Sequence, residues 1–282
     1  MNNLPSSIHD HIASALNEDI QGGDITASLI PENEQLSVRL VCRENAVLCG
    51  IEWFNAAFRQ LDSSINIHWA NKDGDKLKAG QVVCKLNGNA RSILSAERTA
   101  LNFLQTLSAT ASITRRYQKR IKHTDCRILD TRKTIPNLRL AQKYAVTCGG
   151  GLNHRLGLYD AFLLKENHLA AAGNMAKAVT LARSIKPEAI LEVEVEDLAQ
   201  LSQAIDARVD RVLLDNFELN MMQDAVTLVK QRGADKFLKL EASGNITKKR
   251  IKAIAETGVD FISIGALTKH VKAVDFSLRF ID

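Results

Sequence analysis

The feature that most limits how this chain can fold is an alternation of short apolar runs with amphipathic segments in its C-terminal part. Segments with helical periodicity, such as Met175–Ile185 and Leu219–Arg232, separate the runs. This alternation is typical of βα units that build a parallel sheet or barrel. The runs are Arg127–Asp130, Ala161–Leu164, Ile190–Val195, Arg211–Leu214, Phe237–Leu240 and Phe261–Ile264. Because a closed barrel of this kind has eight strands, six runs predict an open or incomplete barrel.

The residues before about position 110 predict a separate α+β domain. Leu36–Cys49 and Val82–Leu86 have the composition of strands, and Asn71–Gly80 has that of a turn region. Ser95–Leu107 predicts a helix that begins at a capping serine, and Ile113–Ile121 predicts a second helix that leads into the repeats. The chain is therefore expected to hold two domains.

Composition and charge exclude some classes of protein. With 282 residues, of which 45% are hydrophobic, the chain can bury a large core, so disorder is not expected. The formal net charge of +5 favours anionic partners. A basic cluster, Arg115-Arg116 with Lys119-Arg120 and Lys122, has the spacing of a solvated helix face and lacks interleaved aromatic residues, which argues against nucleic-acid binding.

Cysteine usage and the N-terminal sequence predict the compartment. The five cysteines are widely spaced and include no C-x-x-C pair, so reduced and mostly structural thiols are expected. Residues 1–20 do not combine a basic segment with an apolar run, and no later stretch is long and apolar enough to span a bilayer. These observations predict a soluble cytoplasmic protein.

Polar residues follow every apolar run of the repeat region. In βα barrels the reaction site is built at the C-terminal ends of the strands, so these residues predict where a site would lie. They are Asp130-Thr131-Arg132-Lys133-Thr134, Lys165-Glu166-Asn167-His168, Glu194 with Glu196, Asp215-Asn216, Ser243-Gly244-Asn245 and Ser263-Ile264-Gly265.

Carboxylates dominate the third run. Glu192, Glu194 and Glu196 alternate with valines, which places all three on one face of a strand. One interpretation is an edge strand with a solvated face. The other is that at least one carboxylate binds ribose hydroxyls or a Mg²⁺ ion with the help of Asp215.

Two other groups of residues indicate an anionic ligand. Ser243-Gly244 and Ser263-Ile264-Gly265 precede helical sequence, where backbone N–H groups and a helix N-terminus commonly hold phosphate. The early βα loops gather basic side chains that suit a ligand with both carboxylate and phosphate groups. These are Arg132, Lys133, Lys165 and, after Gly149-Gly150-Gly151, His154 and Arg155.

Taken in order over nearly the whole chain, these residues resemble the quinolinate phosphoribosyltransferase family, also called nicotinate-nucleotide pyrophosphorylase (carboxylating). Some members of the family have a second glycine where this chain has Asn245. The matching residues are Asn17-Glu18-Asp19, Gly23-Asp24, Thr26, Glu97-Arg98-Thr99, Leu101-Asn102, Thr131-Arg132-Lys133-Thr134, Gly149-Gly150-Gly151, Asn153-His154-Arg155, Leu164-Lys165-Glu166-Asn167-His168, Glu192-Val193-Glu194-Val195, Asp215-Asn216, Glu241, Ser243-Gly244 and Gly265.

The resemblance implies an architecture and an assembly. It implies an α/β fold with an N-terminal α/β sandwich over residues 1–110, joined by a C-terminal tail at 272–282, and an open, incomplete βα barrel over 111–271, as in type II phosphoribosyltransferases. It also implies a homodimer with shared active sites, in which Arg98 of one subunit reaches the quinolinate pocket of the other.

The resemblance further implies roles for the strand-end residues. Arg132, His154, Arg155 and Lys165 would bind quinolinate, and Lys133 would reach the phosphates of phosphoribosyl pyrophosphate (PRPP). Glu194 and Asp215 would hold ribose hydroxyls and Mg²⁺. The phosphate cradle would comprise Ser243, Gly244, Ser263 and Gly265, and the residues expected to act in catalysis are Lys133, Lys165, Glu194 and Asp215.

On this interpretation the enzyme transfers the ribose 5-phosphate of PRPP to quinolinate and releases pyrophosphate and carbon dioxide, which gives nicotinate mononucleotide for de novo NAD biosynthesis. Two alternatives stay open at this point. A relative with the same fold could use nicotinate as the acceptor, although a monocarboxylate needs fewer cationic partners. A non-catalytic barrel could bind anionic metabolites, although binding an anion gains little from Glu194 and Asp215.

Overall fold

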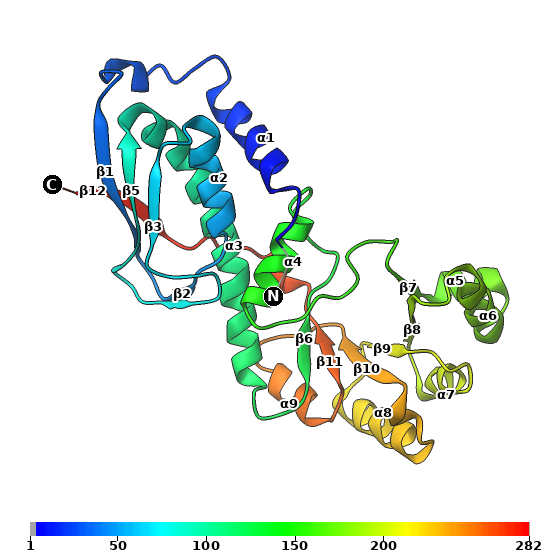
Figure 1. Cartoon of the computed structure of the whole chain (residues 1–282). Coiled ribbons are helices and arrows are strands. Elements are labelled where there is room, and N and C mark those ends of the chain that lie inside the picture. The colour runs from blue at the N-terminus through cyan, green and yellow to red at the C-terminus, as the bar shows by residue number, and fades with distance from the viewer. Residues whose placement is uncertain (1–3, 282) are drawn as a thin grey trace. The chain divides into compact units, whose positions relative to one another are not determined.

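The computed structural model describes residues 4–281, which divide into two compact units (Figure 1). Unit 1 comprises the chain up to Arg115, Thr134–Gly150 and the residues from Ala266 onward. Unit 2 comprises Arg116–Lys133 and Gly151–Gly265. The first change of unit lies close to the expected boundary near residue 110. In contrast to the expected division, Thr134–Gly150 groups with unit 1, and the return to unit 1 begins at Ala266 instead of residue 272.

Unit 1 is built on a four-stranded antiparallel sheet in the order β12-β1-β5-β3. Its strands are β1 (Gln35–Cys42), β3 (Asn66–Trp69), β5 (Gln81–Asn89) and β12 (Phe276–Phe280). β12 comes from the end of the chain and pairs with β1, so the last strand of the chain belongs to the sheet of unit 1.

One strand prediction in unit 1 is wrong in its second half. The run expected from Leu36 to Cys49 ends at Cys42, and Ala46–Val47 forms a separate short strand, β2. β2 pairs with β4 (Lys76–Leu77), which lies inside the predicted turn region 71–80. The chain turns between Cys42 and Ala46, where Asn45 Oδ1 accepts a hydrogen bond from the backbone N–H of Ala79.

Helices α2 and α3 lie beside the sheet of unit 1 (Figure 1), and a continuous apolar core is buried in this unit. The helices of this unit are α1 (Ile8–Ile20), η1 (Ala27–Leu29), α2 (Ile51–Leu61), α3 (Ala90–Arg120), α4 (Arg139–Cys148) and α10 (Ala266–Lys269). The amphipathic helix α2 buries Trp53, Phe54 and Phe58 completely. Burying side chains of this size provides much of the stabilisation of a small sheet domain.

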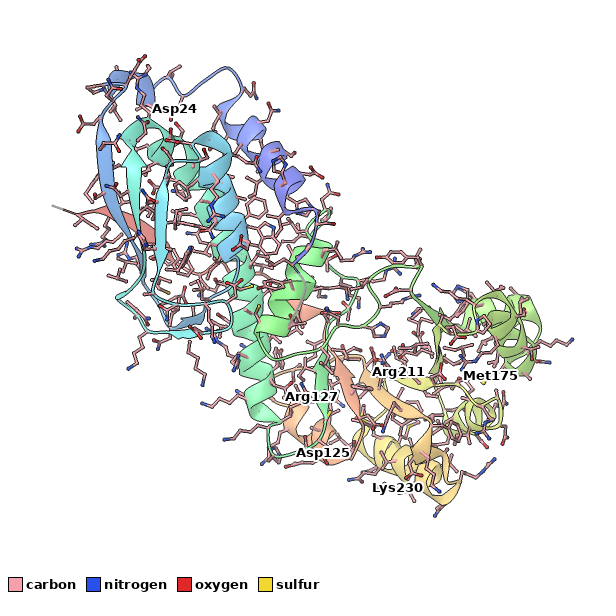
Figure 2. All side chains as sticks on the ribbon, viewed as in Figure 1. Asp24, Asp125, Arg127, Met175, Arg211 and Lys230 are labelled. Carbon is pink, nitrogen blue, oxygen red and sulfur yellow. The ribbon has the colours of Figure 1, made fainter. Side chains whose placement is uncertain are left out.

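The two helices expected over 95–107 and 113–121 are a single helix, α3. Ser95 is not its cap: it lies inside the helix, where its Oγ donates a hydrogen bond to Asp24 Oδ2 (2.8 Å; Asp24 is labelled in Figure 2). The helix instead begins after Asn89, whose Oδ1 accepts from the backbone N–H of Ser92 as an N-cap side chain does. Thr110, which lies between the two predicted helices, is buried within α3.

Unit 2 contains a six-stranded parallel sheet in the order β6-β11-β10-β9-β8-β7. Because β6 and β7 are the two ends of this order, the sheet does not close, as predicted. The strands are β6 (Arg127–Leu129), β7 (Ala161–Leu164), β8 (Ile190–Val195), β9 (Arg211–Asp215), β10 (Lys239–Ser243) and β11 (Phe261–Ser263).

Helices connect the strands of unit 2, and α6 to α9 lie along one side of the sheet (Figure 1). They are α5 (Glu166–Ala172), α6 (Met175–Ile185), α7 (Leu198–Asp206), α8 (Leu219–Gln231), η2 (Ala234–Lys236) and α9 (Ile251–Glu256). The strand expected over 237–240 begins later, at Lys239, because the backbone N–H groups of Phe237 and Leu238 both donate to Ala234 O and continue the turn of η2. Within residues 4–281, every helix is too short or too polar to cross a membrane.

Candidate active site

The register of the parallel sheet places the candidate residues of β8, β9 and β10 on one face. Glu192 lies beside Arg211, Glu194 and Glu241 both lie beside Leu213, and Ser243 lies beside Asp215. Residues that are paired across strands point to the same side of a sheet, as do residues two positions apart along one strand. One face of this sheet is therefore polar.

The opposite face is apolar, with rows such as Val193, Val212 and Leu240 that are buried. The interpretation of β8 as an edge strand is wrong, because β8 pairs with β7 on one side and β9 on the other. Its carboxylates instead become more exposed toward the C-terminal end of the strand, from buried Glu192 through partly buried Glu194 to exposed Glu196, which lies just beyond β8.

Four side chains meet deep on the polar face. The Nε2 atom of His154 lies 2.9 Å from Glu192 Oε2 and 3.5 Å from Glu241 Oε2. Arg211, labelled in Figure 2, approaches the same two carboxylates, with Nη1 at 3.3 Å from Glu241 Oε2 and 3.9 Å from Glu192 Oε2. The guanidinium group also stacks 4.7 Å from the centroid of the Phe261 ring. This group of residues, His154, Glu192, Arg211 and Glu241, is called the floor cluster below.

Backbone contacts fix the histidine of the floor cluster. The backbone N–H of Arg155 donates to His154 Nδ1 at 2.7 Å, so this nitrogen is an acceptor and Nε2 carries the proton that faces Glu192. The backbone N–H of His154 donates to Asp130 Oδ1 at 2.9 Å, which ties the loop to the end of β6. The orientation of the imidazole is thus set before any ligand binds.

The two carboxyl groups of the floor cluster hold protons unusually tightly. Burial raises the pKa of Glu192 to about 7, against the opposing charge of Arg211. Burial also raises the pKa of Glu241 to about 7, and the nearby charge of Glu192 adds to the effect, whereas Ser263 and Arg211 oppose it. Glu192 and Glu241 are 1% and 0% exposed. Near neutral pH, one proton shared by the pair would leave a single negative charge to balance Arg211.

Two arginines form a cationic region near the floor cluster. The pKa of Arg155 is lowered by burial and then by the positive charge of Arg132, although Glu192 and Asp160 oppose the shift. The Nε atom of Arg132 is buried and has no hydrogen-bond partner within the described residues. A buried N–H donor without an acceptor costs about 1–3 kcal/mol. Two guanidinium groups in each other's field, one with such a donor, are suited to an anion that accepts from both.

A lysine pairs with one of the carboxylates at the strand ends. Lys165, directly after β7, donates from Nζ to Glu194 Oε2 at 2.6 Å. The backbone N–H of Lys165 also donates to His168 Nδ1, at 3.0 Å, which fixes the start of α5. Both charged ends remain accessible, since the side chains of Lys165 and Glu194 are 49% and 20% exposed.

The loop after β10 is shaped for close approach. Gly244 has φ +92°, and an added Cβ atom would lie 2.8 Å from Asn216 Cγ, so a side chain there would be strained and would clash. Asn245, where some relatives have glycine, also adopts a left-handed backbone with φ 48°, which asparagine tolerates. The backbone N–H of Asn216 donates to the carbonyl oxygen of Ser243 at 3.1 Å, so this loop and the end of β9 are linked.

Lys133 and Gly265 lie together, although they are far apart in the sequence. A Cβ atom added to Gly265 would lie 2.9 Å from Lys133 Cδ and 3.5 Å from Thr131 Oγ1. The ends of β6 and β11 therefore bring a lysine beside a glycine backbone, a combination suited to phosphate. Ser263 differs from its neighbours: it lies inside β11, is 6% exposed and hydrogen-bonds Glu241.

Unit 2 thus contains every predicted site residue except Arg98. Arg98 lies in unit 1, on α3, and is exposed. The sequence interpretation assigned no role to Arg211, Glu192 or Glu241. A usable signal was present, because Arg211, Leu213 and Asp215 alternate within a strand, and an arginine that begins such a buried strand needs an acidic partner on the same face.

Comparison with known proteins decides the family. A family model described as quinolinate phosphoribosyl transferase, C-terminal domain, matches residues 110–279, and the corresponding N-terminal domain model matches residues 24–108. The chain belongs to the quinolinate phosphoribosyltransferase family. The junction of the two models lies at the domain boundary expected from the sequence.

Relatives of similar length support this assignment. The chain is 39% identical over 267 residues to a probable nicotinate-nucleotide pyrophosphorylase (carboxylating) of Synechocystis, covering 94% of this chain and 90% of the relative. It is 38% identical to a protein of the same name from Bacillus subtilis, covering 93% and 89%. A solved nicotinate-nucleotide pyrophosphorylase from Francisella tularensis superposes with a TM-score of 0.94 at 49% identity, covering 99% and 98% of the two chains.

Proposed function

We propose that this quinolinate phosphoribosyltransferase family member joins quinolinate to the ribose 5-phosphate of PRPP, with release of pyrophosphate and carbon dioxide, in de novo NAD biosynthesis. The observation that carries the proposal is the division of charge among the strand ends of unit 2. Arg132 and Arg155 form a cationic region, whereas Glu194 and Asp215 supply carboxylates on the polar face of the sheet. A dicarboxylate acceptor needs the first group, and a ribosyl donor that develops positive charge needs the second.

Quinolinate would occupy the cationic region. Arg132 and Arg155 would each donate hydrogen bonds to one of its two carboxylates, and the partial burial of both arginines strengthens such contacts. His154, held by the floor cluster, would present its edge to the pyridine ring, and Lys165 would add positive charge at the boundary with Glu194. A monocarboxylate such as nicotinate would leave part of this charge without a partner.

The phosphates of PRPP would lie over the glycine loops. Lys133 beside Gly265 would contact the leaving pyrophosphate, and the backbone at Ser243 and Gly244 would hold the 5-phosphate. Ser263 was expected to join this cradle. Its hydrogen bond to Glu241 gives it a second use in the floor cluster, and a phosphate contact from Ser263 stays a prediction.

Glu194 and Asp215 would hold the ribose hydroxyls and a Mg²⁺ ion. Oxygen ligands suit Mg²⁺, which is commonly bound by one or two carboxylates together with substrate phosphates. The two residues fit this pattern, because they lie on the same face of adjacent strands and both are partly exposed. When bound, Mg²⁺ would offset negative charge on the pyrophosphate.

The reaction follows from these positions. As the bond between the anomeric carbon and pyrophosphate breaks, positive character develops on the ribose ring, and Glu194 and Asp215 stabilise it. Lys133 offsets charge on the departing pyrophosphate. The pyridine nitrogen then bonds to the anomeric carbon and becomes cationic. That cationic nitrogen stabilises the carbanion formed when the adjacent carboxylate leaves as carbon dioxide, and the carbanion takes up a proton from water to give nicotinate mononucleotide.

The proposal is tested by supplying either acceptor. Purified protein is incubated with PRPP, Mg²⁺ and either quinolinate or nicotinate, and nicotinate mononucleotide is measured by chromatography. We expect product from quinolinate and little or none from nicotinate. Product from nicotinate alone would identify a nicotinate-using enzyme, and binding without any product would identify a non-catalytic barrel.

We further propose a homodimer in which Arg98 of each subunit completes the quinolinate pocket of its partner. Arg98 lies outside the unit that holds the other site residues and is exposed. An arginine contributed across a two-fold axis would add a further carboxylate contact to each site. A cytoplasmic location also stays a prediction from the sequence.

Subunit complementation tests the shared site. Arg98→Ala and Glu194→Ala homodimers should each be nearly inactive, whereas a mixed dimer has one site with both changes and one with neither. Random equal mixing makes about half of the dimers mixed, so roughly a quarter of wild-type activity should return. If mass spectrometry shows mixed dimers and no activity returns, Arg98 does not act across the interface.

A further inference from the structure

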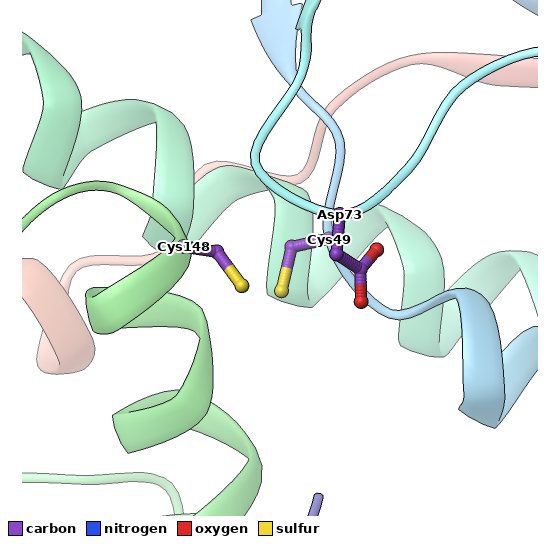
Figure 3. Close-up of side chains that lie close together, drawn as sticks. All are labelled: Cys49, Asp73 and Cys148. Atoms are coloured by element: carbon purple, nitrogen blue, oxygen red, sulfur yellow. The ribbon is translucent and has the colours of Figure 1, made fainter. Parts of the chain in front are cut away.

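Two cysteines far apart in the sequence meet in unit 1, outside the site described above. Cys49 follows β2, and Cys148 is the last residue of α4. Figure 3 shows their sulfur atoms side by side, with the carboxylate of Asp73 on the other side of Cys49. One Sγ atom from each cysteine and a carboxylate oxygen of Asp73 all lie within 4.8 Å of one another.

The backbones of both cysteines are anchored to the same helix, α3. Ser108 Oγ accepts from the backbone N–H of Cys49 at 3.0 Å and donates to its carbonyl at 3.1 Å. Arg115 Nη2 donates to the carbonyl of Cys148 at 3.1 Å. The next residue, Gly149, packs so closely that an added Cβ would lie 2.5 Å from the carbonyl oxygen of Ala111. One rigid helix therefore holds the two thiols opposite each other.

The two thiols differ in reactivity. Cys148 is partly exposed, and its pKa is lowered, first by a hydrogen bond with Cys49 and further by Tyr144 and Arg115, against burial and the charge of Asp73. Cys49 is fully buried, and burial raises its pKa well above the ordinary value. A partly exposed thiol with thiolate character beside a buried second thiol is the arrangement of an attacking and a resolving cysteine.

The surroundings favour sulfur chemistry over a bound cation. Asp73 Oδ1 accepts from the backbone N–H of Gly50 at 3.0 Å and of Ile51 at 3.3 Å, at the start of α2, and Oδ2 accepts from Tyr144 Oη at 2.9 Å. Both carboxylate oxygens are thus already used. The positive charge of Arg115 near Cys148 would also repel a metal ion.

We propose that Cys49 and Cys148 are a redox modification site, at which a peroxide converts the two thiols into a reversible intramolecular disulfide. In the first step the Cys148 sulfur attacks a peroxide oxygen, the O–O bond breaks, and a sulfenic acid and hydroxide form when the oxidant is hydrogen peroxide. In the second step the Cys49 sulfur attacks the Cys148 sulfur, an S–S bond forms and the S–O bond breaks. The hydroxyl group leaves with the Cys49 proton as water.

Disulfide formation balances in electrons and requires only that the two sulfur atoms move closer. The two sulfurs together lose two electrons, which reduce the peroxide, and a thiol reductant restores both cysteines by exchange. An S–S bond is about 2.05 Å long, so the sulfurs must move closer. Rotation about the Cα–Cβ bonds can supply this movement while α3 holds both backbones.

The experiment treats the full-length protein with a small excess of hydrogen peroxide, removes the oxidant, unfolds the chain and counts free thiols with an alkylating reagent by mass spectrometry. The number of labelled cysteines should fall from five to three, the five cysteines of the chain less the two in the disulfide. Peptide mapping without reductant should locate the link between Cys49 and Cys148, and a thiol reductant should restore five labels.

Variants separate the two steps. Cys148→Ser should not form the link, and Cys49→Ser should stop at a Cys148 sulfenic acid that dimedone traps. Cys84→Ser is the matched control, since Cys84 is a buried thiol of β5 whose pKa burial raises to about 12, and this variant should still form the link. If Cys49→Ser does not fold, Tyr144→Phe provides a second probe. It should give the same disulfide more slowly, because Asp73 loses the hydrogen bond from Tyr144 that offsets its negative charge beside Cys148.

Four results would overturn the proposal. These are labelling of all five cysteines after peroxide, a link that involves other cysteines or two chains, oxidation of Cys148 beyond sulfenic acid while Cys49 stays free, and disulfide formation only after a chelator is added. The last would mean that a metal ion occupies the pair. Equal rates with and without the chelator are expected.

Discussion

The floor cluster makes a specific prediction about stability and pH. Changing Glu241 to glutamine removes one of two buried carboxyl groups that share the charge of Arg211, and it preserves the size of the side chain. In the folded protein the pKa of Glu241 is raised to about 7 from its usual 4.5, mainly by burial. The folded state therefore binds a proton more tightly than the unfolded state does, and the associated stability is lost as pH rises through about 7.

The size of the effect follows from the shift. One pKa unit corresponds to about 1.4 kcal/mol, so a carboxyl group shifted this far costs about 2–3 kcal/mol of stability between pH 5 and pH 8. Glu192 and Glu241 bind the shared proton as a pair, so this figure applies to the pair, not to each residue. The difference in the free energy of unfolding between Glu241→Gln and wild type should therefore shift by about 2–3 kcal/mol in favour of the variant as pH rises from 5 to 8.

The measurement is thermal or urea unfolding at several pH values from 5 to 8, followed by circular dichroism. Comparing each variant with wild type at the same pH cancels the contribution of the other titrating groups. Glu188→Gln is the control, because Glu188 is an exposed glutamate just before β8. Its curve should run parallel to wild type. If the Glu241→Gln curve is also parallel, the buried pair is not protonated as described.

Three further predictions concern the ligands. Arg132→Ala or Arg155→Ala should weaken quinolinate binding by roughly 2 to 5 kcal/mol in calorimetry, with a smaller effect on PRPP, and unchanged quinolinate affinity in both would place the acceptor elsewhere. Glu194→Ala should lower kcat more than quinolinate affinity, since its proposed partners are ribose and metal. Steady-state kinetics and calorimetry measure the two effects, and a larger loss of quinolinate affinity than of kcat would contradict this role. Gly244→Ala should raise the KM for PRPP, because it costs about 1–3 kcal/mol of backbone strain, and an unchanged KM would remove this loop from the phosphate site.

The strands and the polar strand ends were predictable because their signals are local. A run such as Ile190–Val195 is apolar, β-branched and followed by charged residues, and the structure gives β8 these same bounds. Signals that depend on a partner elsewhere were misread. Ser95 looks like a helix cap in the sequence, yet it bonds Asp24 from inside α3.

The sequence could indicate that Arg211 needs an acidic partner, but which acids it meets in the floor cluster depends on strand register. Glu192, Arg211 and Glu241 come from three different strands, and the order β10-β9-β8 places the arginine between the two acids. A shift of one residue in either pairing would turn one acid to the apolar face. The meeting of Cys49 and Cys148 depends in the same way on how two distant segments pack on α3.

The central claim, phosphoribosyl transfer coupled to decarboxylation, is tested most directly with quinolinate labelled in the carboxylate next to the ring nitrogen. Labelled carbon dioxide and nicotinate mononucleotide are measured in one reaction with PRPP and Mg²⁺. The account predicts one labelled carbon dioxide for each mononucleotide and none when PRPP is omitted. Mononucleotide that still carries the label, or carbon dioxide released without PRPP, would contradict it.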